Sequence, residues 1–276
     1  MSAQSQPVYP LQQTVRDHTS FSPLYLDEDT WLTLLKLQGP SLGMWRAAEI
    51  AVLREQVRQG RMQEPVLDLG CGDGLVTSQV LNRVEIGLDP DTQAVAKAAS
   101  TGIYTRFETV LVQDVALSDG SIGTVLSNSV LEHIEQIDAV LQRVSGLLRP
   151  GGRLICTMPT EAFSRWLLLP FSPYARWRNQ HYGHLNLWTV EQWRAHLQAV
   201  GLEIEEVRPY MRHSLVWLWD GLELLQRIWI GRCRLFSIGW KRLTPGQLNW
   251  LAHHLSHLNL ASAAPGGGRL IVAHKL

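Results

Sequence analysis

Residues 65–74 read PVLDLGCGDG, an apolar run followed by glycines at positions 70, 72 and 74. A buried strand that ends in a glycine-rich turn and leads into a helix is typical of loops that hold a nucleotide-like ligand. A dinucleotide-binding loop has the pattern G-x-G-x-x-G, whereas Leu75 stands at the position of the third glycine. No Lys-Ser or Lys-Thr pair follows, which excludes a phosphate-binding P-loop.

Asp68 lies in this apolar run, two residues before Gly70. A carboxylate at this place repels the pyrophosphate of a dinucleotide, but it suits a ligand that carries positive charge. S-adenosylmethionine is a nucleoside with a sulfonium and an amino group, so it fits the glycine spacing, the missing lysine and the acid together. The stretch therefore predicts a site for S-adenosylmethionine.

Three further polar positions follow predicted strands. Asp89 stands 19 residues after Gly70, where a carboxylate can accept hydrogen bonds from ribose hydroxyls. Asp114 follows the next strand, where it can accept from an adenine amino group, and Asn128 follows the fourth, beside the expected methyl group. Ligands of open α/β sheets bind at the carboxyl ends of the strands, so these positions favour one shared site.

Strand and helix patterns alternate along the chain. Strands are predicted over 65–69, 84–88, 107–112, 122–127, 153–158, 202–208 and 269–275, and helices over 27–37, 41–59, 74–81, 91–100, 135–148 and 189–200. Short, continuously apolar strands are typical of a parallel sheet with helices on both faces, hence of an α/β fold.

The length of 276 residues favours one elaborated domain. Far more residues separate the last two strands than a sheet connection needs. We therefore expect an N-terminal arm and cap helices over 1–60, an S-adenosylmethionine-binding domain over 61–210 with 266–276, and a helical insertion over 211–265.

The segments VLDLGCGDG, IGLDP, VQDV, SNSVLEHI and LLRPGGRLICTMP together resemble the motifs of class I S-adenosylmethionine-dependent methyltransferases, in the small-molecule, ubiquinone-methyltransferase-like group, over about residues 40–210. The resemblance implies a Rossmann-like sheet of seven strands whose last strand, here 269–275, is antiparallel. It also implies that Asp68, Gly70 and Gly72 line the methionine part of the cofactor, Asp89 with Pro90 the ribose, Asp114 with Val115 the adenine, and Asn128 the methyl group. Relatives often have an acidic residue at the start of the fourth strand, where this chain has Gly123.

A methyl acceptor that carries a proton needs a base. His133, with Glu132 beside it, is the candidate base, and His184 could approach the same pocket. The stretch SVLEH is similar to the ExxEH of ubiquinone-type O-methyltransferases and of small-RNA 2′-O-methyltransferases, in which it helps to bind a divalent metal. Ser129 replaces the first glutamate, so no metal is expected. In the alternative interpretation, His133 packs at a helix end and His184 belongs to a loop.

Charge is unevenly distributed, although the formal net charge is +0. Residues 1–160 carry 12 Lys and Arg against 18 Asp and Glu, and residues 161–276 carry 13 against 7. The distribution permits an anionic partner for the second part, although most such segregation is only solvated surface. The three cysteines are far apart and no signal peptide or spanning helix is evident, so we expect a cytoplasmic protein and leave open its peripheral association with a membrane.

Residues 213–242 combine apolar, aromatic and basic side chains. Helical spacing places Leu218, Leu222, Leu225 and Trp229 on one stripe and Asp220, Glu223 and Arg227 on another face. Trp and Arg around an apolar stripe are typical of helices that lie in a membrane interface. The alternatives are a helical pair that caps the sheet and a dimer contact. The oligomeric state stays open.

The sequence favours a methyltransferase that modifies a small, largely apolar acceptor, such as a quinone, isoprenoid, lipid or aromatic metabolite, at an oxygen atom. The first alternative is RNA or protein methylation. The basic residues are interleaved with Trp and Leu, however, so no nucleic-acid partner is expected. The second alternative is a peripheral-membrane scaffold that keeps the cofactor fold without turnover. Asp68 and Leu75 together disfavour a nicotinamide oxidoreductase.

Overall fold

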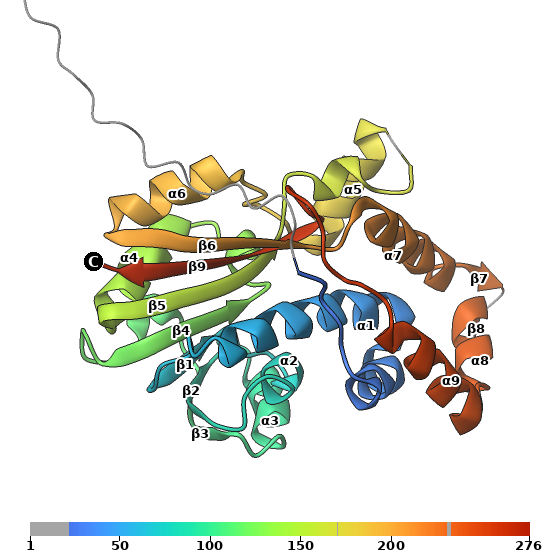
Figure 1. Ribbon diagram of the computed structural model, residues 1–276, viewed down its shortest axis with the longest axis horizontal. Coiled ribbons are helices and arrows are strands. Elements are labelled where there is room, and N and C mark those ends of the chain that lie inside the picture. The colour runs from blue at the N-terminus through green and yellow to red at the C-terminus, as the bar shows by residue number, and fades with distance from the viewer. Residues whose placement is uncertain (1–21, 170, 231–232) are drawn as a thin grey trace, which may run out of the picture.

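A seven-stranded sheet forms the centre of the protein (Figure 1). The computed structural model describes residues 22–169, 171–230 and 233–276. The strands are β1 Val66–Leu69, β2 Val84–Leu88, β3 Tyr104–Glu108, β4 Ile122–Asn128, β5 Leu148–Pro159, β6 Leu202–Tyr210 and β9 Gly268–Lys275, in the order β3-β2-β1-β4-β5-β9-β6. Strands β1 to β5 are parallel, and β9 runs antiparallel between β5 and β6. The predicted sheet and its antiparallel last strand are confirmed.

Helices cover both faces of the sheet, as predicted (Figure 1). The helices are α1 Glu28–Arg58, α2 Leu75–Ser78, α3 Thr92–Ala99, α4 Ile137–Leu147, α5 Ser172–Tyr182, α6 Val190–Ala199, α7 His213–Gln226, α8 Leu235–Lys241 and α9 Pro245–Ser256. Successive strand residues point to opposite faces. Val66 and Leu126 accordingly belong to the core cluster that α1 covers, whereas Leu67 and Val125 belong to the cluster under α4 and α6. The central strands β1 and β4 are mainly apolar because both of their faces are buried.

The third strand lies earlier than predicted. It covers Tyr104–Glu108 instead of 107–112, and Val112–Asp114 forms a 3₁₀ turn. β3 is an edge strand in which Thr105 and Arg106 are exposed, so it needs no continuous apolar run. The apolar residues that suggested the strand include Val112, which is buried beneath the turn.

The two predicted N-terminal helices are the halves of α1, which bends at Gly39 (φ 72°, ψ −176°) just before Pro40. Asp27 caps the helix by accepting a hydrogen bond from the Thr30 amide at 2.9 Å. The second half is almost wholly buried against the sheet. Because it lies there, a polar residue of α1 can reach the carboxyl ends of the strands.

Gly123 explains one departure from the family pattern. A Cβ atom at this position would lie 2.6 Å from the carbonyl oxygens of both Gln63 and Glu64. Backbone this close leaves no room for any side chain. The acidic residue that relatives carry at the start of this strand is therefore sterically excluded here.

Residues between β6 and β9 form α7, a short hairpin of β7 Trp229–Ile230 with β8 Cys233–Arg234, and then α8 and α9. Both α7 and α9 pack against α1. Helix α7 ends at Gln226, and Trp229 lies in β7. The prediction that Trp229 belongs to the helical stripe is therefore wrong. Among the described residues, no helix is both long enough and apolar enough to cross a membrane.

Candidate active site

The loop after β1 turns tightly against its neighbours. The backbone amides of Gly70 and Cys71 both donate to the Leu88 carbonyl, at 2.7 and 3.1 Å. Gly70 has φ +72°, and a Cβ atom there would lie 2.4 Å from Cγ2 of Val130. Only glycine fits at a position that requires both a left-handed backbone and so close an approach.

Asp89 holds the same loop from the end of β2. One of its oxygens accepts from the Gly72 amide at 3.0 Å, and the other accepts from the Asp91 amide at 2.9 Å. Gly72 has φ +54°, and a Cβ atom there would meet nothing within 4 Å. Gly70 is thus needed for packing, whereas Gly72 borders open space in which a ligand can lie against the backbone.

Asp68 is a buried carboxylate at the end of β1. It lies opposite Gly87 of β2 and Leu126 of β4, and its Oδ2 accepts a hydrogen bond from Tyr104 Oη at 2.6 Å. Burial raises the pKa of Asp68 to about 6. A buried, acceptor-only group favours a ligand that brings hydrogen-bond donors or positive charge, as the amino group of S-adenosylmethionine does.

Affinity for S-adenosylmethionine is expected to level off above about pH 7 and, below pH 6, to approach a tenfold fall per pH unit. The reason is that a cation binds the ionised form of Asp68, and protons compete for that form below its pKa. Calorimetric titration between pH 5 and 7.5 measures the slope. Asp68→Asn should bind more weakly and lose the slope, whereas Asp73→Asn, an exposed change in the same loop, should keep it. A slope that persists in Asp68→Asn would contradict this role.

The remaining predicted cofactor residues lie along the same edge of the sheet. Asp114 is exposed at the end of the 3₁₀ turn after β3, Val115 is buried next to it, and Pro90 is exposed after β2. Asn128 ends β4, where its Oδ1 accepts from Thr157 Oγ1 at 2.7 Å. The geometry is compatible with the roles that the family resemblance implies.

The sequence analysis missed Glu49, a fully buried carboxylate of α1. It accepts hydrogen bonds from Trp45 Nε1 at 2.9 Å, Arg46 Nη1 at 2.7 Å, Asn128 Nδ2 at 3.1 Å and Ser129 Oγ at 2.5 Å. The chain lacks the first glutamate of ExxEH at Ser129, and Glu49 brings a carboxylate to that serine from another element. The available signal was a single acid within the apolar run AAEIAVL.

Glu132, His133 and His184 come together beyond β4. His133 Nδ1 lies 3.1 Å from the Gly183 carbonyl oxygen, and its Nε2 lies 3.6 Å from Glu132 Oε1. A carbonyl can only accept, so Nδ1 carries the hydrogen in neutral His133 and Nε2 keeps its lone pair. The ring of His184 lies 5.5 Å from that of His133, centroid to centroid.

Burial shifts the pKa values of Glu132 and His184, the two neighbours of His133. It raises the pKa of Glu132 to about 8, with a further contribution from the charge of Glu49. It lowers the pKa of His184 to about 4, helped by His133 and Arg178. Near neutral pH, Glu132 is therefore mostly protonated and His184 is neutral.

One ligand atom from each of Glu132, His133 and His184 lies within 4.8 Å of the others, so these side chains could hold a metal ion. The expectation that no metal is needed stays a prediction.

An aromatic cluster adjoins these histidines. Its members are Trp45, Phe163, Tyr182, His184 and Trp219, with centroid distances of 5.6 Å for Trp45–Phe163, 5.3 Å for Phe163–His184, 5.6 Å for Tyr182–His184 and 5.4 Å for Trp45–Trp219. The rings come from α1, α5, α7 and the segments around them, so distant parts of the chain build one apolar wall beside His133. Such a wall suits an apolar acceptor.

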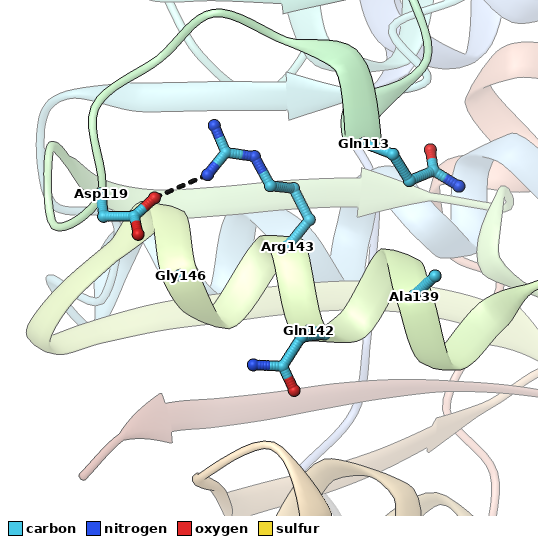
Figure 2. A pocket seen from close by; sticks show the side chains of 6 residues that line it. All are labelled: Gln113, Asp119, Ala139, Gln142, Arg143 and Gly146. Atoms are coloured by element: carbon cyan, nitrogen blue, oxygen red, sulfur yellow. Dashed lines mark hydrogen bonds and ion pairs between the residues drawn. The ribbon is translucent and has the colours of Figure 1, made fainter.

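Figure 2 shows a surface hollow on the outer side of α4, lined by Gln113, Asp119, Ala139, Gln142, Arg143 and Gly146. Arg143 spans it, pairing with Asp119 at 2.6 Å and donating to the Leu117 carbonyl at 2.7 Å. None of the predicted site residues lines this hollow. Its polar groups fasten the loop before β4 to α4, and we assign it no chemistry.

Comparison with known proteins agrees with this geometry. Residues 44–207, more than half of the chain, match a methyltransferase domain family. The chain therefore belongs to this family, within the class I S-adenosylmethionine-dependent methyltransferases, and its cofactor is S-adenosylmethionine.

Individual relatives are more distant. The ubiquinone biosynthesis O-methyltransferase of Colwellia psychrerythraea (strain 34H) is 24% identical over 118 residues, which cover 40% of this chain and 48% of the Colwellia protein. The chain spans about half the length of the curated relatives it matches.

Two solved structures share the fold. An S-adenosylmethionine-dependent methyltransferase of Thermotoga maritima matches with a TM-score of 0.54 and 12% identity, over 89% of this chain and 100% of that one. The phosphoethanolamine N-methyltransferase 2 of Haemonchus contortus, in complex with phosphomonomethylethanolamine and S-adenosylhomocysteine, matches with a TM-score of 0.52 and 15% identity, over 89% and 60%.

Proposed function

We propose that this protein transfers a methyl group from S-adenosylmethionine to an oxygen atom of a small, largely apolar acceptor, such as a quinone, isoprenoid, lipid or aromatic metabolite. The observation that carries the proposal is the Nε2 lone pair of His133, whose ring is fixed by Gly183, beside the aromatic cluster. An oxygen nucleophile must lose a proton, and a fixed imidazole suits that task. The O-methyltransferase name of the Colwellia relative adds support at low identity.

The bound cofactor supplies an electrophilic methyl group on a sulfonium. The residues that would hold it are Asp68, Gly72, Asp89 and Asp114, which line one sheet edge and offer carboxylates and open backbone. The aromatic cluster binds and orients the acceptor and excludes water from it. His133 Nε2 accepts the proton of the acceptor hydroxyl, while the hydrogen bond to Gly183 keeps the ring in place. The Glu132 carboxyl lies 3.6 Å from this nitrogen, and its ionised fraction would stabilise the resulting imidazolium.

Turnover is expected with apolar phenols and catechols and not with matched anilines. The test incubates the purified chain with S-adenosylmethionine labelled in the methyl group, and pairs of alkyl-substituted phenols and anilines of equal size. Product analysis by mass spectrometry shows which atom receives the label. Methylation of the anilines alone would overturn the assignment to oxygen. Cofactor binding by calorimetry without turnover on any acceptor would instead support the scaffold alternative.

A further inference from the structure

Helix α7 turns its charged residues inward. Asp220 is fully buried: it pairs with Arg178 Nη2 at 2.7 Å and accepts from Tyr174 Oη at 2.7 Å and from the Leu168 amide at 2.9 Å. Glu223 accepts from Tyr182 Oη at 2.7 Å and from Ser41 Oγ at 2.5 Å. These are the acids of α7: Asp220 faces α5, and Glu223 faces α5 and α1.

The opposite face of α7 is apolar and exposed. Trp217, Leu218 and Leu225 leave 53, 46 and 42% of their surfaces exposed, and Ile228 just after the helix leaves 45%. At 100° per residue, positions 217, 218 and 225 share one side of the helix. The sequence predicted an apolar stripe with charges on another face. The structure buries Asp220, turns Glu223 toward Tyr182 and Ser41, and exposes much of the stripe, which is the reverse of an ordinary amphipathic helix.

The exposed face continues onto α5. Trp177 of α5 is 44% exposed, and the guanidinium carbon of Arg227 lies 5.5 Å from its ring centroid. Figure 1 shows α5 and α7 next to one another at the edge of the molecule. We name the residues Trp177, Trp217, Leu218, Leu225 and Ile228 the α7 surface.

The fully exposed charged residues that the structure describes in this segment are basic. Arg212 is exposed at the start of α7, Arg227 is partly exposed at its end, and Lys241 and Arg242 are exposed at the end of α8. Of the two acids of residues 212–242, Asp220 is fully buried, whereas Glu223 leaves 18% of its side chain exposed and lies 3.7 Å from Arg227. Arg212 and Arg227 stand at the two ends of α7, and an apolar face with Trp and basic residues at its ends complements a membrane surface with anionic headgroups.

We propose that the α7 surface binds the interface of an anionic lipid bilayer, with the apolar side chains among the acyl chains and the basic residues at the headgroups. A nucleic acid would leave the apolar side chains without a partner. A purely apolar protein surface would leave the basic residues at the ends of α7 without an anionic partner. The proposal rests on this surface alone and is independent of the proposed reaction.

Co-sedimentation of the full chain with vesicles tests the proposal. The protein should sediment with equimolar phosphatidylglycerol and phosphatidylcholine, and far less with phosphatidylcholine alone. Replacing Trp217, Leu218 and Leu225 by serine should weaken partitioning by at least about tenfold. The matched control replaces Trp250, Leu37 and Leu276, which are more exposed but lie outside the α7 surface, and should bind as the wild type. Arg212→Glu with Lys241→Glu should also weaken binding.

Thermal unfolding and S-adenosylmethionine affinity of each variant show whether the fold is retained. Equal sedimentation of the α7-surface variant and the control variant would overturn the proposal. Failure of the wild type to sediment with anionic vesicles at low salt would also overturn it. A wild type that is dimeric in gel filtration while the Trp217, Leu218, Leu225 variant is monomeric would assign the surface to a second copy of the chain, and would also overturn it. None of these readouts depends on methyl transfer.

Discussion

Replacing His133 by alanine is expected to lower the rate of methyl transfer to an oxygen acceptor about 100-fold, with little change in S-adenosylmethionine affinity. The change removes the Nε2 lone pair, whereas the glycine loop and the acids that would hold the cofactor stay in place. Single-turnover measurement with labelled cofactor gives the rate, and calorimetry gives the affinity.

Chemical rescue of the His133→Ala variant distinguishes a catalytic base from a histidine that has only a structural role. Added imidazole should restore part of the lost rate in His133→Ala, because the deleted ring leaves space beside the partly exposed site. The control is His196→Ala on α6, whose ring stacks on Trp188 and pairs with Asp138. It should turn over normally. An unchanged rate in His133→Ala would reduce His133 to a packing role and leave the proton acceptor to be found elsewhere.

Replacing Gly72 by alanine is expected to weaken S-adenosylmethionine binding about 10- to 100-fold, since a methyl group inserted into an occupied site costs about 1–3 kcal/mol. The new Cβ atom meets no protein atom within 4 Å, so the fold itself has room for it. The clash would be with the ligand alone. Calorimetric titration measures the loss.

Gly60→Ala is the matched control. Gly60 also has a positive φ, +68° against +54° for Gly72, and a Cβ atom there also meets nothing within 4 Å. Both variants therefore carry similar backbone strain and should have similar melting temperatures. If both bind the cofactor as the wild type does, the open space at Gly72 is not the cofactor site.

The sequence predicts the strands best where both of their faces are buried. The apolar residues of β1, β2 and β4, which lie inside the sheet, locate these strands to within one residue, although β5 begins at Leu148, five residues before the predicted start. β3 is an edge strand with exposed residues, so a search for buried apolar runs does not locate it. The glycine loop was predictable because its backbone demands are local: Gly70 and Gly72 need positive φ, and Asp68 and Asp89 follow from strand ends.

The parts that the sequence could not predict depend on distant contacts. Glu49 joins Asn128 and Ser129, about 80 residues away, and nothing near Glu49 in the chain signals them. Helical spacing located the apolar stripe of α7, but it could not tell which side would face the protein. The choice follows from Arg178, which pairs with Asp220 and draws the charged side inward.

The place of β9 has a consequence for how the chain folds during synthesis. β9 hydrogen-bonds to β5 on one side and β6 on the other, and within the described residues β6 has no other strand beside it in the sheet. β6 and all of α7 to α9 leave the ribosome before residues 268–275 do. Until then the nascent sheet ends at β5, with an unpaired edge that other chains could join. The sheet is therefore completed only after β9 has been synthesised. A chain stalled before residue 268 is expected to bind chaperones.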